Sequence, residues 1–321
     1  MEDTEEKNDE LVAGKEEKEE NGFCSKNTIA LIIIVCFLLS IGLVILAIII
    51  YLARDYKLSP LEVYEKYNKI ENISVGDNGV VYKAKNKNTS EIVSIKEIKL
   101  STTKIRDEVK NDILFTKAIH KYTNKSIEIK ELFEERSTKF IVTEYYDKDL
   151  FIVLNEIKGT EGFDVSTIKN IMIQLNEVLN ILRQKNIVHH NIKLESILVQ
   201  MNNNSTIENN FEIRLSNYSQ AKLLTNNSKE WEEIKPYKDY KKEELTILEK
   251  QDLLDIGKEI YHMYFKNKII DKDKIKKDIN DEDLKDLLNK LLEDDYNKRI
   301  EWNDYFAHKF FNIDNDTLVD N

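Results

Sequence analysis

Cysteine, proline and glycine are scarce in this chain, which holds two, two and eight of them among 321 residues. So few glycines and prolines exclude a collagen-like or loop-dominated protein. Both cysteines, Cys24 and Cys36, precede the globular part, which excludes a disulfide framework or a cysteine metal cluster there. No stripe of basic residues is present, so we expect no nucleic-acid partner. The hydrophobic content of 41 % is still enough for a folded core.

Acidic residues are concentrated at the N-terminus. Residues 1–20 hold ten acids and three lysines, which accounts for about −7 of the formal net charge of −11. A segment with so few apolar residues has little surface to bury, and we expect residues 1–27 to form a disordered tail. It is either a solvated spacer or an acidic docking tail. A second short tail is expected over 313–321.

A single long apolar run follows this acidic tail. Residues 28–53 contain no charged side chain. As a helix rising about 1.5 Å per residue, the run exceeds the roughly 30 Å of bilayer hydrocarbon. It is too long for a signal-peptide core and has no small-residue cleavage site. The sequence therefore predicts one N-terminal transmembrane helix, followed by a linker over 54–66.

Beyond the linker, apolar residues first recur at every second position and later recur about every 3.6 residues. Alternation predicts strands at 69–75, 79–85, 91–99, 127–133 and 139–145, with one helix at 105–119. Later apolar stripes predict a long helix capped by Asp164 or Ser166, a helix starting near Asp252, and a leucine-rich helix around 284–292. The order predicts an α+β fold with a strand-rich lobe before a helical lobe.

Four short stretches carry polar residues at points where these elements meet. They read S-V-G-D-N-G-V-V at 74–81, V-S-I-K at 93–96, I-V-H-H-N-I-K-L-E-S-I-L at 187–198 and I-R-L-S-N-Y-S-Q-A-K at 213–222. Together they resemble the nucleotide loop, the lysine strand, the catalytic loop and the metal-binding segment of the eukaryotic protein kinase family. The resemblance covers about 67–311. It implies a two-lobed protein-kinase-like domain at 67–312, with a five-stranded N-lobe at 67–145 and a mainly helical C-lobe at 146–312.

The resemblance implies nucleotide-binding residues in the N-lobe. Glycines between two strands let backbone N–H groups approach phosphates closely. Lys96 resembles the family lysine that contacts the α- and β-phosphates. Asp112 stands at the position of the glutamate that pairs with this lysine. Because aspartate is one methylene shorter than glutamate, we expect a long or water-bridged ion pair. Thr143 resembles a small gatekeeper before the hinge residue Glu144. The nucleotide-binding residues implied in the first loop are Ser74, which replaces a glycine, Gly76, Gly79 and Val81.

The catalytic loop resembles the family in shape and differs in chemistry. Asn191 stands where the family has its catalytic aspartate, while Lys193 matches. An amide has no basic lone pair near neutral pH, so Asn191 can orient a hydroxyl but cannot accept its proton. Ser196 and Asn217 stand at the two metal-ligand positions, where hard cations prefer anionic oxygens. We therefore expect Mg²⁺ binding to be weak or absent, with ATP as a possible ligand.

The residues that support the catalytic loop match the family better than the residues that would take part in the reaction. Asp252 resembles the aspartate that braces the backbone of the catalytic loop. His190 replaces the arginine that usually receives a phosphorylated activation segment. Tyr237 replaces the glutamate that pairs with a buried arginine, here Arg299, and Glu243 or Glu244 could substitute.

Three functions remain open from the sequence. The first is a pseudokinase that acts as a scaffold or allosteric regulator and still binds ATP. The second is a divergent Ser/Thr kinase with low activity, and the third is a structural anchor with an empty cleft. The expected partners are a membrane, crossed once, and an unidentified protein. Lysine and arginine are nearly balanced on the two sides of the apolar run, and only the resemblance places the kinase-like domain in the cytosol.

Overall fold

The computed structural model describes residues 30–47, 62–76, 79–157, 159, 161–201, 211–224, 234 and 242–312. The expected tails at 1–27 and 313–321 lie outside the described residues. The described residues belong to two units, a helix at Ala30–Ala47 and the chain from Glu62 onwards.

The first unit is described only by its apolar helix. Ala30–Ala47 is 18 residues long with a mean hydropathy of 3.2, and none of it is buried inside the protein. The remaining residues of the expected 28–53 span lie outside the described part. Length and composition would let this helix cross a bilayer, although a signal sequence would meet the same two criteria.

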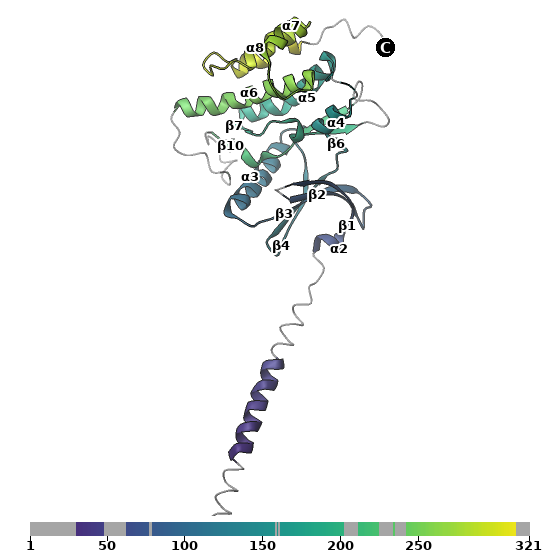
Figure 1. The fold of residues 1–321 in the computed structure, drawn as a ribbon, viewed down its shortest axis with the longest axis vertical. Helices are drawn as coiled ribbons and strands as arrows, with labels where there is room; N and C mark the ends of the chain where they lie inside the picture. The colour runs from purple at the N-terminus through teal and green to yellow at the C-terminus, as the bar shows by residue number, and fades with distance from the viewer. Residues whose placement is uncertain are drawn as a thin grey trace, which may run out of the picture. The chain divides into compact units, whose positions relative to one another are not determined.

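The second unit begins with an antiparallel sheet in the strand order β1-β2-β3-β5-β4 (Figure 1). Each predicted strand is present within a few residues of its expected bounds. The helix α3 connects β3 to β4 and carries Asn111 and Asp112, which bond to the helical part of the unit. The elements of this lobe are α2 (Glu62–Lys66), β1 (Tyr67–Gly76), β2 (Gly79–Asn86), β3 (Ile92–Lys99), α3 (Thr103–His120), β4 (Ile129–Glu135) and β5 (Thr138–Glu144).

The short helix α2 corrects the expectation of a linker reaching residue 66. Val63 is fully buried, and the hydroxyl of Tyr64 donates to the Glu97 carboxylate at 3.0 Å. The Tyr64 ring also meets the ring of Phe140 edge-on. Periodicity could not reveal a five-residue helix, because a single buried position has no period.

The rest of the second unit is mainly helical. Figure 1 places α5, α6, α7 and α8 at the end opposite the five-stranded sheet. Two small sheets, β10-β7 and β6-β8-β9, also belong to this part of the unit. The elements are β6 (Lys148–Asp149), α4 (Leu150–Glu156), α5 (Val165–Gln184), β7 (Ile187–Val188), η1 (Leu194–Ser196), β8 (Ile197–Met201), β9 (Phe211–Leu215), η2 (Tyr218–Gln220), β10 (Lys222–Leu223), α6 (Lys242–Phe265), α7 (Lys272–Asp278), α8 (Glu282–Leu291), α9 (Trp302–Phe306) and η4 (Lys309–Phe311).

The structure confirms one predicted helix start and corrects another. Asp164 is the N-cap of α5, and its carboxylate accepts the Thr167 N–H, so the first of the two predicted caps is confirmed. The predicted helix start near Asp252 was wrong, because this helix, α6, begins ten residues earlier, at Lys242. Its first turns are rich in charged residues and lack the apolar stripe that marks an amphipathic helix.

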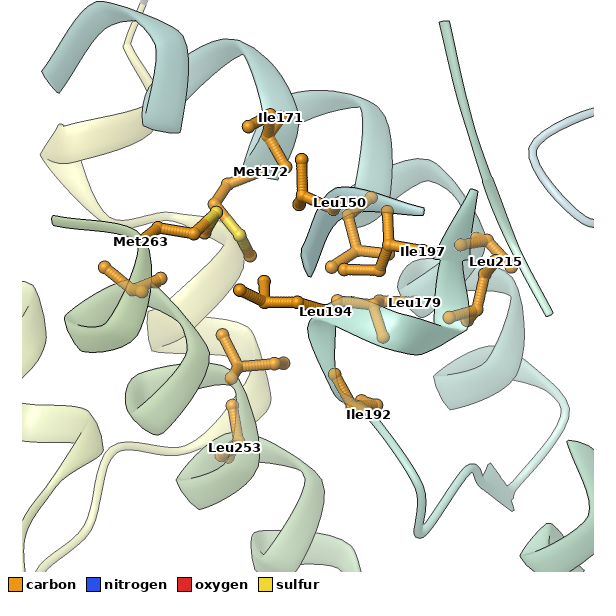
Figure 2. Close-up of a cluster of buried hydrophobic side chains, with 14 of the residues drawn as sticks. Leu150, Ile171, Met172, Leu179, Ile192, Leu194, Ile197, Leu215, Leu253 and Met263 are labelled. Atoms are coloured by element: carbon orange, nitrogen blue, oxygen red, sulfur yellow. The ribbon is translucent and has the colours of Figure 1, made fainter. Parts of the chain in front are cut away.

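The catalytic-loop segment is anchored in the hydrophobic core of the helical lobe. Figure 2 shows Ile192, Leu194 and Ile197 from this segment among core side chains of α5 and α6. These three side chains are at most 4 % exposed. Burial of an aliphatic side chain contributes about 1.5–3 kcal/mol, so the path of this backbone is held by packing rather than by its polar residues.

Candidate functional site

A cavity of about 380 Å³ lies between the five-stranded sheet and the helical lobe. Its lining includes nine of the residues predicted as a site, from both lobes. Asn191, Lys193 and Ser196 do not belong to the lining. The nine predicted residues are Ser74, Gly76, Gly79, Val81, Lys96, Asp112, Thr143, Glu144 and Asn217; the other lining residues are Ile73, Ser94, Thr116, Ile127, Ile129, Ile141, Tyr146, Lys148, Asp149, Ile152, Glu195, Leu198 and Ser216.

The turn between β1 and β2 needs glycine at its second end. Gly79 has a φ of +120°, a region that other residues rarely adopt. A Cβ placed there would lie 2.1 Å from the Glu97 carbonyl oxygen of β3. Gly76 pairs with Gly79 across the turn, and Ser74 pairs with Val81. The strands therefore hold the implied nucleotide loop close to β3, the strand of Lys96.

Lys96 and Asp112 form the predicted ion pair across the back of the cavity. The Lys96 ammonium lies 3.4 Å from Asp112 Oδ2, a long contact that agrees with the shorter aspartate side chain. Asp112 Oδ1 accepts the Tyr218 N–H at 2.8 Å. One carboxylate thus connects β3 in the sheet to the segment after β9 in the helical lobe.

Asn111 makes a second connection beside this ion pair. Its amide nitrogen lies 3.3 Å, 3.0 Å and 2.8 Å from the carbonyl oxygens of Tyr218, Ser219 and Ala221. The sequence analysis did not identify Asn111, because its partners lie more than a hundred residues away in the chain. Asn111 and Asp112 together fix α3 against η2.

The side chain of Thr143 marks the back of the cavity. Its hydroxyl donates to the Glu144 carbonyl at 3.2 Å, and the Tyr146 hydroxyl donates to the Glu144 carboxylate at 2.7 Å. Burial is the main cause that raises the pKa of Tyr146 far above its ordinary value, so its proton stays in that hydrogen bond. Three apolar side chains, Ile127, Ile129 and Ile141, line the same cavity as Thr143.

Asp252 braces the backbone of the catalytic-loop segment, as the resemblance implies. Its two carboxylate oxygens accept the N–H groups of His189 and His190 at 2.7 Å and 2.8 Å. Burial raises the pKa of Asp252 to about 7, while these two hydrogen bonds act in the opposite direction. Asp252 lies within α6, so the brace comes from a helix interior rather than from a helix start.

His189 is buried with both ring nitrogens in hydrogen bonds. Nδ1 accepts the Asn191 N–H at 3.2 Å, which leaves Nε2 as the donor to the Ser216 carbonyl at 3.2 Å. Burial lowers the pKa of His189 to about 4, so the ring is neutral at pH 7. The ring also packs on Tyr218, with centroids 4.8 Å apart. His189 is therefore a packing residue that joins the two polar segments.

His190 differs from the arginine of the family in charge as well as in shape. Its backbone is left-handed, with a φ of +58°. Its Nε2 atom is buried and has no hydrogen-bond partner among the described residues. Burial is the main cause that lowers the pKa of His190, which favours the neutral ring and gives no cation for a phosphate.

The implied metal positions do not fit Mg²⁺. Asn217 offers one neutral carbonyl oxygen, and this oxygen already accepts the Ser219 hydroxyl at 2.9 Å. The Ser196 hydroxyl is fully buried and donates to the Asn191 carbonyl at 3.0 Å. Mg²⁺ prefers an octahedron of oxygens with one or two carboxylates among them. No set of three metal-binding side chains is found in the part of the chain that the structure describes.

Arg299 makes hydrogen bonds to backbone carbonyls. Its guanidinium donates to the carbonyl of Glu293 at 3.0 Å and 2.9 Å, and to the carbonyl of Lys250 at 3.1 Å. The Lys250 ammonium returns a bond of 2.9 Å to the Arg299 carbonyl. Tyr237, expected near this arginine, lies outside the described residues. The substitute partners Glu243 and Glu244 do not occur in these bonds.

Several cavity residues were missed by the sequence analysis. Glu195 and Leu198 belong to the quoted catalytic-loop stretch, and Asp149 is the N-cap of α4, whose Ile152 N–H it binds at 2.8 Å. An N-cap aspartate before an apolar run is a recognisable signal for a helix start. Nothing in the sequence marks its carboxyl group as part of a cavity.

A sheet lobe and a helical lobe share one cleft, which a lysine–carboxylate pair and a glycine turn both border, and this arrangement defines a two-lobed kinase-like fold. A model of the protein kinase domain matches residues 67–311, more than half of the chain. This protein therefore belongs to the eukaryotic protein kinase family, and the predicted family is confirmed. Protein kinases in general use ATP with Mg²⁺.

Several curated proteins are similar to part of this chain. Cyclin-dependent kinase-like 4 of Mus musculus is 31 % identical over 138 residues, 42 % of this chain and 39 % of that protein. The CTD kinase subunit alpha of Schizosaccharomyces pombe is 29 % identical over 160 residues, 50 % of this chain and 25 % of that protein. Cyclin-dependent kinase-like 5 of Homo sapiens is 34 % identical over 140 residues, 42 % of this chain and 14 % of that protein. The chain thus spans less than half of each of these relatives.

Proposed function

We propose that this protein is a pseudokinase that binds an adenine nucleotide in its cleft and acts by binding, as a scaffold or allosteric regulator. The observation that supports the proposal is the contrast between the cavity and its metal positions. The cavity has the glycine turn, the apolar walls and the Lys96–Asp112 pair. Asn217 and Ser196 are neutral, and their side-chain oxygens already take part in internal hydrogen bonds.

The chemistry of phosphoryl transfer explains why this contrast matters. The reaction is accelerated by positioning and by neutralising the charge of the phosphates, which is mainly the task of metal ions. Asn191 cannot take the proton of a substrate hydroxyl, and a general base typically contributes about 10²–10⁴ in rate. With both contributions reduced, binding is the function that the site favours.

Nucleotide binding with and without metal tests this proposal. Thermal unfolding of the full-length chain in detergent should shift upward with ATP, by nearly the same amount in Mg²⁺ and in EDTA. Lys96→Met should reduce this shift, because Lys96 lines the cavity. Absence of any shift at millimolar ATP would favour the third function, an anchor with an empty cleft.

A divergent kinase of low activity is the second candidate, and the intact geometry favours it. Asp112 reaches both Lys96 and the Tyr218 N–H, and Asp252 holds the loop backbone. Transfer of phosphate from labelled ATP to a general protein substrate is the decisive assay. Transfer that disappears in Lys96→Met would overturn the pseudokinase proposal and establish the second candidate.

We further propose that the apolar helix anchors the protein in a membrane as a single span, with the kinase domain in the cytosol. The length and hydropathy of Ala30–Ala47 support the span. Protease treatment of sealed vesicles tests the orientation. In vesicles whose outer surface is the outer face of the membrane, the protease should remove the acidic tail and leave the kinase domain intact if the proposed orientation is right. The reverse pattern would contradict it.

A further inference from the structure

The side chains that line the cleft carry more negative than positive charge. The lining holds four carboxyl groups and two lysines, which amounts to a formal charge of −2. The carboxyl groups are those of Asp112, Glu144, Asp149 and Glu195, and the lysines are Lys96 and Lys148. A ligand with several phosphate groups would bring further negative charge into this space.

Both lysines of the lining already have anionic partners. Lys96 lies 3.4 Å from Asp112, and Lys148 lies 2.5 Å from Glu156, which does not belong to the lining. Each pair is close to neutral as a whole, so neither lysine offsets the remaining carboxyl groups of the lining. Among the described residues of the lining, no cation other than these two is present.

Two carboxyl groups of the lining, those of Asp149 and Glu195, come from the helical lobe. Burial raises the pKa of Asp149, whereas its cap of the α4 N-terminus, where the carboxylate accepts the Ile152 N–H at 2.8 Å, favours the charged form. Glu195 pairs with Lys268 at 3.2 Å, but the Lys268 side chain is 60 % exposed and lies outside the lining. These carboxylates suit hydroxyl donors, such as those of a ribose, better than phosphates.

In a site of this kind, bound metal ions normally neutralise the phosphates. Asn217 and Ser196 provide no anionic oxygen for such an ion, so the negative carboxylates stay uncompensated. We infer that the cleft selects a nucleoside such as adenosine over its di- and triphosphates. The apolar walls would hold the base, and the phosphates would lower the affinity. This inference rests on the proposed nucleotide binding.

Affinities of adenosine, ADP and ATP for the full-length chain in detergent, measured by calorimetry in EDTA, test the inference. We expect adenosine to bind most tightly, and ATP about tenfold or more weakly. The ratio should approach one as the ionic strength rises, because salt screens the repulsion. Equal or tighter binding of ATP in EDTA would overturn the inference and leave the proposed function standing. If neither ligand binds the folded chain, both are overturned.

Two neighbouring aspartates provide a matched pair of variants. Asp149→Asn removes one charge from the lining and keeps a residue that caps helices well. It should tighten ATP binding several-fold relative to adenosine binding, because the two ligands share the ribose and differ in the phosphates. Asp147 is exposed, bonds to Gln200 at 3.0 Å and does not line the cavity, so Asp147→Asn should change neither affinity. Equal effects of the two variants on ATP would contradict the inference.

A third variant restores an anionic metal ligand. Asn217 has a φ of +65°, and aspartate tolerates this left-handed conformation. In Asn217→Asp, Mg²⁺ should tighten ATP binding about tenfold or more, while EDTA should leave adenosine preferred. A preference for ATP in both conditions would overturn the inference.

Discussion

The two walls of the cleft differ in which groups they present. The wall from the sheet and α3 presents a charged pair, Lys96 and Asp112. The wall from the helical lobe presents the carboxyl groups of Asp149 and Glu195 but only an amide at the metal position, Asn217. Asn191 and Ser196, outside the lining, are also neutral. Both walls have an ordered backbone: Gly79 fits against β3, and Asp252 binds two N–H groups of the loop.

The comparison separates the position of a residue from its chemistry. The loop between β7 and β8 is held by buried Ile192, Leu194 and Ile197 and by Asp252. None of these four groups belongs to the cavity lining. A change at Asn191 or Asn217 therefore alters the reaction without removing the forces that place the backbone. This is why a kinase fold can persist without the groups that phosphoryl transfer needs.

The largest expected effect comes from restoring chemistry on the helical wall. Asn191→Asp combined with Asn217→Asp should raise phosphate transfer from labelled ATP in Mg²⁺ by about 10²–10⁴-fold, since a base and a metal ligand return to a positioned backbone. The same double change with Lys96→Met should show no gain. Continued inactivity would place a defect on the sheet wall, at Asp112 or Ser74, and the comparison would fail.

A large loss of stability is expected when the brace is removed. Asp252→Ala leaves the N–H groups of His189 and His190 buried without an acceptor. Each such group costs about 1–3 kcal/mol, so the free energy of unfolding should fall by about 2–6 kcal/mol. Urea unfolding of the full-length chain in detergent, followed by tryptophan fluorescence, measures the change.

Asp255 serves as the control for the brace. It lies on the next turn of α6 and bonds to Gln251 and Lys258 on the same helix. Asp255→Ala should lower the free energy of unfolding by less than about 1 kcal/mol. Equal losses for the two alanine variants would mean that helix charge, rather than the brace, determines stability.

The neutral, buried His189 predicts a pH dependence. Between its folded pKa of about 4 and its ordinary 6.5, the unfolded chain binds more protons than the folded one, so raising the pH stabilises the fold. His189→Phe should remove this term. The advantage of the wild type over the variant should grow by about 2–3 kcal/mol from pH 4 to pH 6.5.

Asp252 contributes with the opposite sign over nearly the same range. Its folded pKa is raised from 3.8 to about 7, so the folded chain binds the extra proton and this contribution falls as the pH rises. Because Asp252 is present in both proteins, its contribution largely cancels from the difference between wild type and His189→Phe. A difference that does not change with pH would show that His189 titrates normally in the fold.

The smallest effect concerns the link between the two walls. Asn111→Ala should lower the free energy of unfolding by about 1–2 kcal/mol, because three carbonyls of the helical wall lose their donor. Amide hydrogen exchange should also rise around Tyr218. Lys110→Ala, at the exposed neighbouring position, is the control and should change neither measurement. Unchanged exchange in Asn111→Ala would show that the walls are held together without this amide.

Much of the fold could be predicted from periodicity. The strands of the sheet and the helices α3, α5 and α8 follow from alternation and apolar stripes. The start of α6 and the helix α2 could not, because their residues lack such a stripe. The contact of Tyr64 with Glu97 stabilises α2 instead.

The site was predicted in part. Nine named residues line one cavity, because motifs at strand ends and turns converge there. Asn111 and Asp149 were missed, since an asparagine on a helix and a helix cap are common residues whose partners cannot be seen in a linear sequence. The sequence also could not show that Asn191, Lys193 and Ser196 stay outside the lining.

Residue identity alone determined that an amide stands where a base is needed and that no carboxylate stands at either metal position. That conclusion needs no coordinates, because an amide has no basic lone pair in any fold. Only the tertiary structure decided where the remaining oxygens point and which charges share one space. The Ser196 hydroxyl donates to the Asn191 carbonyl, and Asp149 and Glu195 approach a cavity that Lys96 enters from the other lobe. Electrostatic energy depends on distance and burial, which folding sets between residues far apart in the chain.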